Sequence, residues 1–217
     1  SETNILHPAI TGMIGWKPNA PEKSATLSPR FPLHWDSVSV RNLRVGKSVL
    51  QLTMKREKWT TKYHLVLAKG SAVTVNFSPE IPDGMIIRQA KVNGRDVNVS
   101  SDRALGLLAR PITFTVNKQT EVELNHSKGI GMIPLMPKPQ PGDSSIGLRI
   151  IKTTLQGDTY SLEVEGKGGA TGVFEMMMFD QELKSVEGGN IEKITGDGRV
   201  TLTVSFDGSQ SGFTRKT

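Results

Sequence analysis

The sequence predicts an all-β protein: an antiparallel β-sandwich followed by a second, smaller immunoglobulin-like β-sandwich, with a short N-terminal helical segment. Apolar and polar residues alternate in short runs, which is the pattern of half-buried strands. The 217 residues include 22 glycines and 12 prolines, a content typical of many turns. No long helical pattern follows residue 16. These three observations favour an all-β class with short strands and many turns.

The most regular pattern lies between Leu27 and Glu57 and predicts two strands joined by a turn. Apolar residues occupy alternate positions in Val38–Arg41 and again in Leu50–Lys55, and Gly46-Lys47 marks the tight turn between them. The lead-in, Pro29–Leu33, is expected to be extended because each proline disfavours a helical conformation in the residue before it.

Further strands follow on the same alternation, separated by turn residues. They are predicted at Tyr63–Leu67, Val73–Phe77, Met85–Val92, Val97–Val99, Ile112–Val116 and Val122–Leu124. Asn93-Gly94 is the strongest short-range signal for a hairpin turn. The last two strands are expected to pair as another hairpin around Asn117–Thr120.

A proline-rich stretch, Pro134–Ser145, divides the chain because it holds four prolines and a glycine, which make it stiff and extended. We therefore expect a β-sandwich domain over 21–133, a linker over 134–143 and a small β-sandwich over 144–217. Gly208–Thr217 shows no alternation and is expected to be frayed.

The first 16 residues are apolar and read as a short helix that Pro8 limits. They are too apolar to stand free in water, because each exposed Leu or Ile forgoes roughly 1.5–3 kcal/mol of burial. We expect this segment to dock on the β-domain, with Trp16 mostly buried. The apolar residues are Ile5, Leu6, Ile10, Met13, Ile14 and Trp16.

The run L-x-P-R-F-P-x-x-W-x-S-V-x-V-x-N-L-R-V-G over 27–46, preceded by Gly15–Pro21, resembles a known family. It is similar to the C-terminal β-domain of bacterial glycoside hydrolases of the amylo-α-1,6-glucosidase (glycogen-debranching) type, whose catalytic unit is an (α/α)6 barrel. The resemblance implies that residues 1–20 are the end of the last barrel helix. It also implies that the catalytic carboxylates lie upstream in the barrel, so that this chain contains no catalytic residue.

The resemblance further implies a non-catalytic accessory β-region that packs on the catalytic domain of the same polypeptide and stabilises it in carbohydrate degradation. A periplasmic or extracellular bacterial location goes with that implication, and the cytoplasm stays open. Two other functions stay open as well. One is a carbohydrate-binding module that holds polysaccharide, and the other is a cell-surface interaction module in 144–217.

Composition and motifs exclude several kinds of chemistry. The chain has no cysteine, hence no disulfide and no thiolate nucleophile or ligand. No histidine pair has metal-ligand spacing, so no metal site and no cofactor are expected. The carboxylates of Glu57, Glu80, Asp83, Asp96 and Asp102 lie in predicted loops and turns, where they would be solvated, so a glycosidase acid and base are not expected either. The histidines are His7, His34, His64 and His126.

Charge is uneven along the chain but does not indicate nucleic-acid binding. Residues 1–142 carry 19 Lys/Arg against 10 Asp/Glu, a balance of +9, and residues 143–217 carry 8 against 11, a balance of −3. Arg41, Lys55 and Lys62 fall at alternate strand positions, as expected for the solvated face of a sheet, and no nucleic-acid motif accompanies them. No apolar run reaches the length of a membrane span.

Aromatic residues are the remaining candidates for binding, because their apolar faces match the C–H faces of sugars. Trp59 lies among Lys and Thr residues at a hairpin tip, so we assign it, with Tyr63, to carbohydrate binding. Trp16, Trp35 and Ile14 are assigned to packing between the terminal segment and the sheet, because large apolar side chains are usually buried.

Overall fold

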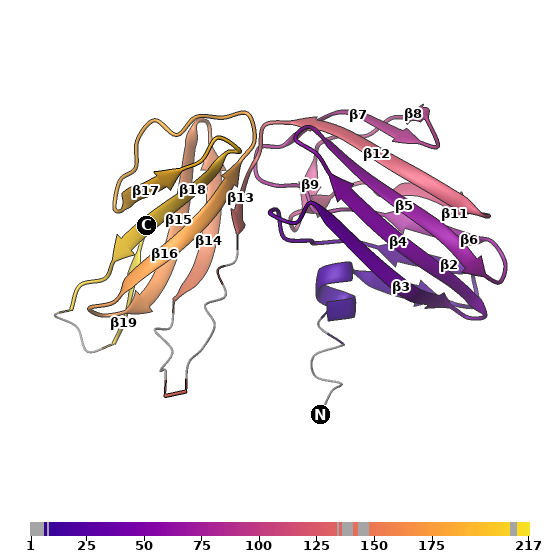
Figure 1. Ribbon diagram of the computed structural model, residues 1–217, viewed down its shortest axis with the longest axis horizontal. Coiled ribbons are helices and arrows are strands. Elements are labelled where there is room, and N and C mark those ends of the chain that lie inside the picture. Colours follow the sequence, from indigo (N-terminus) through magenta and orange to yellow (C-terminus); the bar gives the residue numbers. More distant parts are fainter. Residues whose placement is uncertain (1–6, 8, 134, 136–140, 143–147, 209–211) are drawn as a thin grey trace. The chain divides into compact units, whose positions relative to one another are not determined.

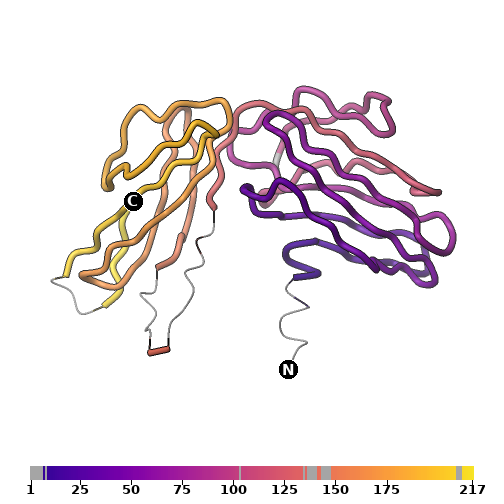
Figure 2. Tube along the Cα trace, viewed as in Figure 1, coloured from indigo at the N-terminus to yellow at the C-terminus, as the bar shows by residue number. Residues whose placement is uncertain are grey.

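A computed structural model shows a chain whose secondary structure is mostly β-strand (Figure 1), which confirms the all-β prediction. The structure describes residues 7, 9–133, 135, 141–142, 148–208 and 212–217. The chain forms two compact units, Ser1–Ser127 and Lys128–Thr217, and Figure 2 traces its course through each of them.

The first unit is a sandwich of a four-stranded and a six-stranded sheet. The smaller sheet contains, in spatial order, β1 (Trp16–Asn19), β2 (Ser24–Leu27), β6 (Val73–Phe77) and β11 (Ile112–Val116). The larger contains β3 (Ser37–Val45), β4 (Ser48–Arg56), β5 (Thr60–Lys69), β12 (Gln119–Ser127), β7 (Ile86–Val92) and β8 (Arg95–Val97). A separate two-stranded hairpin contains β9 (Arg103–Ala104) and β10 (Leu107–Leu108). The β2–β6 pair is parallel, so the predicted antiparallel sandwich contains one parallel pair.

The core of this sandwich follows the predicted alternation. Leu50, Leu52 and Met54 of β4 have no exposed surface, whereas Gln51 and Lys55, which alternate with them, are exposed. The turn at Gly46-Lys47 joins β3 to β4 as expected, with Gly46 at a φ of 57°. Each fully buried aliphatic side chain contributes roughly 1.5–3 kcal/mol relative to its exposure.

Two neighbouring strands do not pair as the sequence predicted. The predicted hairpin around Asn117–Thr120 does not form, because β11 pairs with β6 in the small sheet whereas β12 pairs with β5 and β7 in the large one. The chain crosses between the layers at this point, where the Leu67 amide donates to the Lys118 carbonyl over 2.8 Å. Alternation identifies the buried side of each strand but does not say which sheet the strand joins.

The N-terminal segment is only partly helical. A short π-helix, η1 (Ala9–Ile14), ends at Gly15, whose φ is 66°. A Cβ atom on Gly15 would lie 2.1 Å from the Ser28 carbonyl oxygen, so only glycine is accommodated there. Residues 16–19 then form β1, so the expected helix over 1–20 is wrong in its last part. Ile5 and Leu6 lie outside the described residues.

The second unit contains a four-stranded and a three-stranded sheet. The first has β13 (Ile130–Ile133), β16 (Thr171–Met178), β18 (Arg199–Ser205) and β17 (Asn190–Ile194). The other has β14 (Arg149–Gln156), β15 (Thr159–Lys167) and β19 (Phe213–Lys216). Buried side chains from both sheets form its cores: Ile130, Met176, Met178, Val200 and Leu202 in one cluster and Val164, Phe174 and Phe206 in another.

The boundary between the units lies earlier than the sequence predicted. Strand β13, which the prediction placed in the first domain over 21–133, pairs with β16 of the second unit. The proline-rich stretch therefore connects two strands of one unit, β13 and β14. Most of the predicted linker, at 134, 136–140 and 143, lies outside the described residues.

The C-terminus forms a strand instead of fraying. Strand β19 pairs with β15, and charged side chains fix it there. Glu165 accepts hydrogen bonds from Arg215 Nε at 3.0 Å and from Arg149 Nε at 2.7 Å. The guanidinium of Arg149 also lies 5.9 Å from the Phe213 ring centroid. Three of the four residues of β19 are exposed, which explains why the strand shows no alternation in sequence.

Because β13 belongs to the second unit, cleavage within 136–147 should not separate two folded pieces. We expect the nicked protein to elute as one species under native conditions and as two in denaturant, by size-exclusion chromatography with mass spectrometry. Buried Ile130 and Ile133 hold β13 in place without a covalent link. Separation of the pieces under native conditions would contradict this pairing.

Glu165→Gln should loosen β19, because the substitution removes the charge that both arginines share. Arg215 and then Arg149 hold the pKa of Glu165 below its usual range, so its contribution is present above the unfolded pKa and is lost as pH falls through the folded one. We expect faster amide exchange in β19 at pH 7 and a lower melting temperature of the second unit. Glu175→Gln on β16 is the control, and equal effects would contradict the assignment.

Candidate functional site

Trp59, the aromatic residue predicted to bind sugar, lies in the β4–β5 turn. The Glu57 amide donates to the Thr60 carbonyl over 2.8 Å and closes this turn. The Trp59 carbonyl accepts from the His126 amide at 2.9 Å, which ties the turn to β12. The ring is half-buried, and the Lys58 ammonium lies 4.9 Å from its centroid, within the range of a cation–π contact.

Tyr63, the other predicted sugar-binding residue, faces the core. Its side chain is 4% exposed and meets Phe77 of the opposite sheet with ring centroids 4.8 Å apart. Burial raises the pKa of Tyr63 to about 12. The assignment of Tyr63 to a surface site is therefore wrong: it occupies the inward position between Lys62 and His64, where a strand places its side chain on the opposite face.

A row of polar side chains crosses four strands of the large sheet, beginning beside Trp59. Thr60 Oγ1 donates to Asn125 Oδ1 over 2.7 Å, and Asn125 Nδ2 donates to Gln89 Oε1 over 3.3 Å. Gln89 Nε2 donates in turn to Asp96 Oδ1 over 2.7 Å. Sequence reasoning missed this row because its members come from β5, β12, β7 and β8 and share no local motif.

An ion pair extends the row along β5 and β12. Lys62 Nζ lies 3.2 Å from Glu123 Oε2, and Asn125 Nδ2 donates to Glu123 Oε1 over 3.2 Å. The hydrogen bond from Lys62 is the main reason that the pKa of Glu123 lies below its usual range. The row thus presents amide, hydroxyl and carboxylate groups that are already hydrogen-bonded to one another.

Three described carboxylates, Glu123, Glu165 and Asp197, have a pKa that is held below its usual range. The first causes are hydrogen bonds from Lys62, Arg215 and Thr195 respectively. A general acid needs the opposite shift, which burial without a cation supplies. Nor do three or more His, Asp or Glu side chains gather as metal ligands anywhere in the described ranges.

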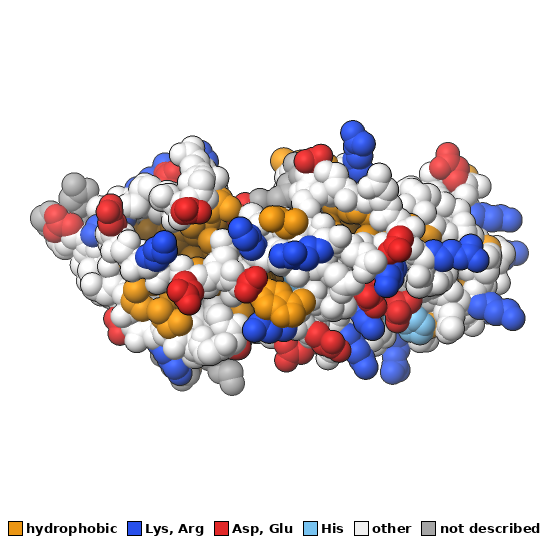
Figure 3. Space-filling model, turned by 90° about the horizontal axis from the view of Figure 1, so that it is seen from above, with side chains coloured by type: hydrophobic (Ala, Val, Ile, Leu, Met, Phe, Trp, Pro, Cys, Tyr) orange, Lys and Arg blue, Asp and Glu red, His pale blue; other side chains and the backbone are white. Residues whose placement is uncertain are grey.

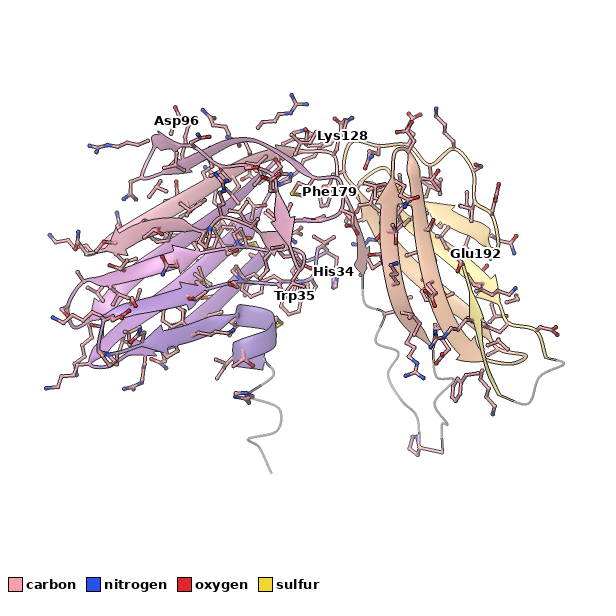
Figure 4. All side chains as sticks on the ribbon, turned by 180° about the vertical axis from the view of Figure 1, so that it is seen from behind. His34, Trp35, Asp96, Lys128, Phe179 and Glu192 are labelled. Atoms are coloured by element: carbon pink, nitrogen blue, oxygen red, sulfur yellow. The ribbon has the colours of Figure 1, made fainter. Side chains whose placement is uncertain are left out.

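Arg56 holds the turn that precedes β3 in the first sandwich. Its Nη1 donates to the carbonyls of Pro32, Leu33 and Trp35 over 3.0, 2.9 and 3.3 Å. These bonds fix the turn that carries His34 and Trp35, whose rings meet edge to face with centroids 6.3 Å apart (Figure 4). Trp35, which we expected to pack against the sheet, is half-buried on this turn.

The two other predicted packing residues are buried in the first core. Ile14 is 8% exposed and Trp16 is 4% exposed, which confirms the expected burial of Trp16. The indole nitrogen of Trp16 donates to the Arg44 carbonyl of β3 over 3.2 Å. Ile14 and Trp16 are therefore part of this sandwich, and Trp16 links β1 of the small sheet to β3 of the large one.

The surface in Figure 3 shows no single-sign field over the first unit. Basic and acidic side chains are interspersed there, and hydrophobic side chains appear in small groups. Arg41 and Lys55 are exposed and Lys62 is partly exposed, as predicted for the solvated face of a sheet. Within the described part of the chain, no helix is long and apolar enough to cross a membrane.

Comparisons with known proteins give only distant likenesses. No known family model and no curated protein matches this chain. Among solved structures, it is similar to a GH127 β-L-arabinofuranosidase from Geobacillus stearothermophilus T6 (12% identity, TM-score 0.36, covering 97% of this chain and 35% of that one). It is also similar to a protein described as a glycoside hydrolase (15%, 0.35, 86% and 34%) and to another GH127 β-arabinofuranosidase (12%, 0.33, 88% and 34%).

The chain spans about a third of the length of these structures. Their names agree with the resemblance at the level of glycoside hydrolases and give no support to the amylo-α-1,6-glucosidase type. At such identities and TM-scores the likeness carries no argument about sites or substrates, which rest on the residues described above.

The buried His126 predicts a pH dependence of the first unit's stability. Burial, and then the charge of Arg56, lowers the pKa of His126 to about 4, whereas an unfolded histidine titrates near 6.5. Between these values the unfolded chain binds the extra proton, so stability is full above pH 6.5 and falls by about 3 kcal/mol toward pH 4.

Urea unfolding at several pH values, followed by tryptophan fluorescence, measures this loss, because all three tryptophans lie in the first unit. His126→Gln should flatten the profile over this interval, whereas His64→Gln on the solvated face should not. An unchanged slope in His126→Gln would assign the acid sensitivity to other groups.

Proposed function

We propose that this chain is a non-catalytic accessory β-region of a larger glycoside hydrolase, which packs on the catalytic domain of the same polypeptide and stabilises it. The proposal places the parent protein in the bacterial periplasm or outside the cell. The parent enzyme is proposed to be a glycoside hydrolase, and no amylo-α-1,6-glucosidase activity is proposed for it.

One observation supports the non-catalytic part: hydrogen-bond donors hold Glu123, Glu165 and Asp197 in their charged form. A glycosidase needs a protonated carboxyl group that is ready to give its proton to the leaving oxygen. Glu123 and Glu165 each lie against a cation, which favours loss of that proton. A residue with the opposite environment has to come from elsewhere in the parent enzyme.

The residues that carry the resemblance, in and around the lead-in Pro29–Leu33, support the packing part of the proposal. Phe31 and Trp16 are 2% and 4% exposed, and the carbonyls that follow Phe31 are fixed by Arg56. The residues that carry the resemblance thus build a rigid end of the sandwich. A rigid surface loses little conformational freedom when another domain packs on it.

The test is to mix the purified chain with the separately produced catalytic domain. We expect the chain alone to hydrolyse neither α-glucans nor aryl glycosides, and to bind the catalytic domain and raise its melting temperature. Turnover by the chain alone that disappears on substitution of one Asp or Glu would overturn the non-catalytic part. A catalytic domain that neither binds the chain nor gains stability from it would overturn the accessory part.

A second candidate function, carbohydrate binding, is favoured by the polar row that begins at Thr60, the residue after Trp59 in the chain. Sugar-binding sites combine an aromatic ring, on which the C–H face of a pyranose stacks, with polar groups that hydrogen-bond to its hydroxyls. Trp59 is half-buried, and Gln89 and Asp96 are exposed, so these groups are accessible.

Affinity electrophoresis in gels that contain soluble polysaccharide tests this second function. If Trp59 and Gln89 bind sugar, Trp59→Ala and Gln89→Ala should each abolish retardation. Lys47→Ala, in the β3–β4 turn, should leave retardation unchanged. Wild-type mobility that no tested polysaccharide alters would argue against the sugar site and leave the accessory role untouched.

A further inference from the structure

The β9–β10 hairpin carries the most exposed large apolar side chain of the described residues. Leu105 is 93% exposed at the tip, where only Leu105 and Gly106 connect the two strands. Both residues have positive φ angles, 52° and 80°. A leucine rarely adopts this left-handed conformation, because its Cβ atom crowds the following carbonyl.

The same sandwich contains a second turn of this kind with favoured residues. Asn93 and Gly94 connect β7 to β8 with φ angles of 51° and 76°. Asparagine and glycine are the residues that such turns prefer. The β9–β10 turn has nearly the same φ angles, so the turn itself gives no reason for a leucine at position 105.

The rest of the hairpin is firmly attached to the sandwich. The Ile81 amide donates to the Gly106 carbonyl, and the Leu108 amide donates to the Pro79 carbonyl, both over 2.9 Å. Ser78 Oγ donates to the Leu108 carbonyl over 2.5 Å, and the side chain of Leu108 is 2% exposed. The tip is therefore held in place by the rest of the hairpin, which is hydrogen-bonded to the sandwich and partly buried in it.

A positive charge lies beside the tip. Arg30 Nη2 donates to the Leu105 carbonyl over 3.3 Å, and the Arg30 side chain is exposed. Its partner in this bond is a neutral carbonyl, so the bond leaves the guanidinium charge available. The first unit as a whole carries 17 Lys/Arg against 10 Asp/Glu, a balance of +7.

We propose that Leu105 is a docking anchor that inserts into an apolar pocket with an acidic rim on the catalytic domain of the same polypeptide. The inference rests on the proposed accessory function and names the contact that would carry it. A rigid aliphatic side chain that stands clear of its own surface fits a concave apolar pocket, and Arg30 fits a carboxylate at the rim of that pocket.

Other partners match this tip less well. A sugar offers hydroxyls and a flat C–H face, whereas an isobutyl group provides neither a hydrogen bond nor a flat ring. A membrane would need a larger apolar patch than this tip, which is a single leucine beside an arginine. A second copy of the first unit would bring two surfaces of balance +7 together, which charge repulsion opposes.

Leu105→Asn separates docking from folding, because asparagine suits the turn and removes the anchor. We expect this variant to melt at or above the temperature of the wild-type chain. In surface plasmon resonance on the immobilised catalytic domain, its Kd should rise by about tenfold or more, as for loss of an interface anchor. Leu105→Asp keeps a turn-forming residue and adds repulsion from an acidic rim, so it should bind still more weakly.

Ile194→Asn is the matched control, because Ile194 is another exposed aliphatic residue, 56% exposed, at the end of β17 in the second unit. It should bind as the wild-type chain does. Wild-type binding that Leu105→Asn and Leu105→Asp leave unchanged overturns the anchor while the accessory function stands. No binding by the wild-type chain overturns the accessory function itself. Self-association that depends on Leu105, measured by light scattering, would assign the anchor to a second copy and overturn this partner.

Discussion

The hydrogen bonds of the Arg56 guanidinium hold the turn before β3, and this part of the first sandwich depends on them. The guanidinium satisfies three backbone carbonyls of a turn between two prolines and β3, where no strand partner is available. The Pro32 carbonyl also accepts from the Trp35 amide over 3.0 Å, so the Arg56 side chain and the backbone of the turn together hold these partly buried carbonyls. The same charge lies close enough to Tyr63 and His126 to lower the pKa of each, against burial in the case of Tyr63.

This arrangement explains why the first unit tolerates polar groups in its interior. His126 stays neutral next to a fixed cation, and its Nε2 lies 3.3 Å from Thr61 Oγ1. A neutral imidazole requires less desolvation than a charged one, which burial would penalise strongly. The polar end of the core is thus compatible with a stable sandwich only above the range in which histidine takes up its proton.

The sequence was informative about strands and much less so about their partners. Alternation located β4, β5 and β6 and the Asn93-Gly94 turn, because each depends on neighbours in the chain. It did not reveal the parallel β2–β6 pair, the β13–β16 pair or strand β19, which depend on residues far apart in sequence. The candidate site divides in the same way. The sequence predicted that Trp59 lies at a hairpin tip. The inward face of Tyr63 and the row from Thr60 to Asp96 became apparent only from the strand pairing in the structure.

The two candidate surfaces differ in what a partner would have to displace. Along the polar row, Asn125 and Gln89 already bond to neighbouring side chains, so a sugar hydroxyl must replace existing hydrogen bonds and gains only the difference. The Leu105 side chain has almost no protein contact to lose, and its hairpin is already ordered. Nearly all of the free energy of burying this side chain is therefore available for binding a partner. On these grounds protein docking at the β9–β10 tip is energetically simpler than sugar binding on the sheet. These energetic grounds favour the proposed accessory role over the proposed sugar binding.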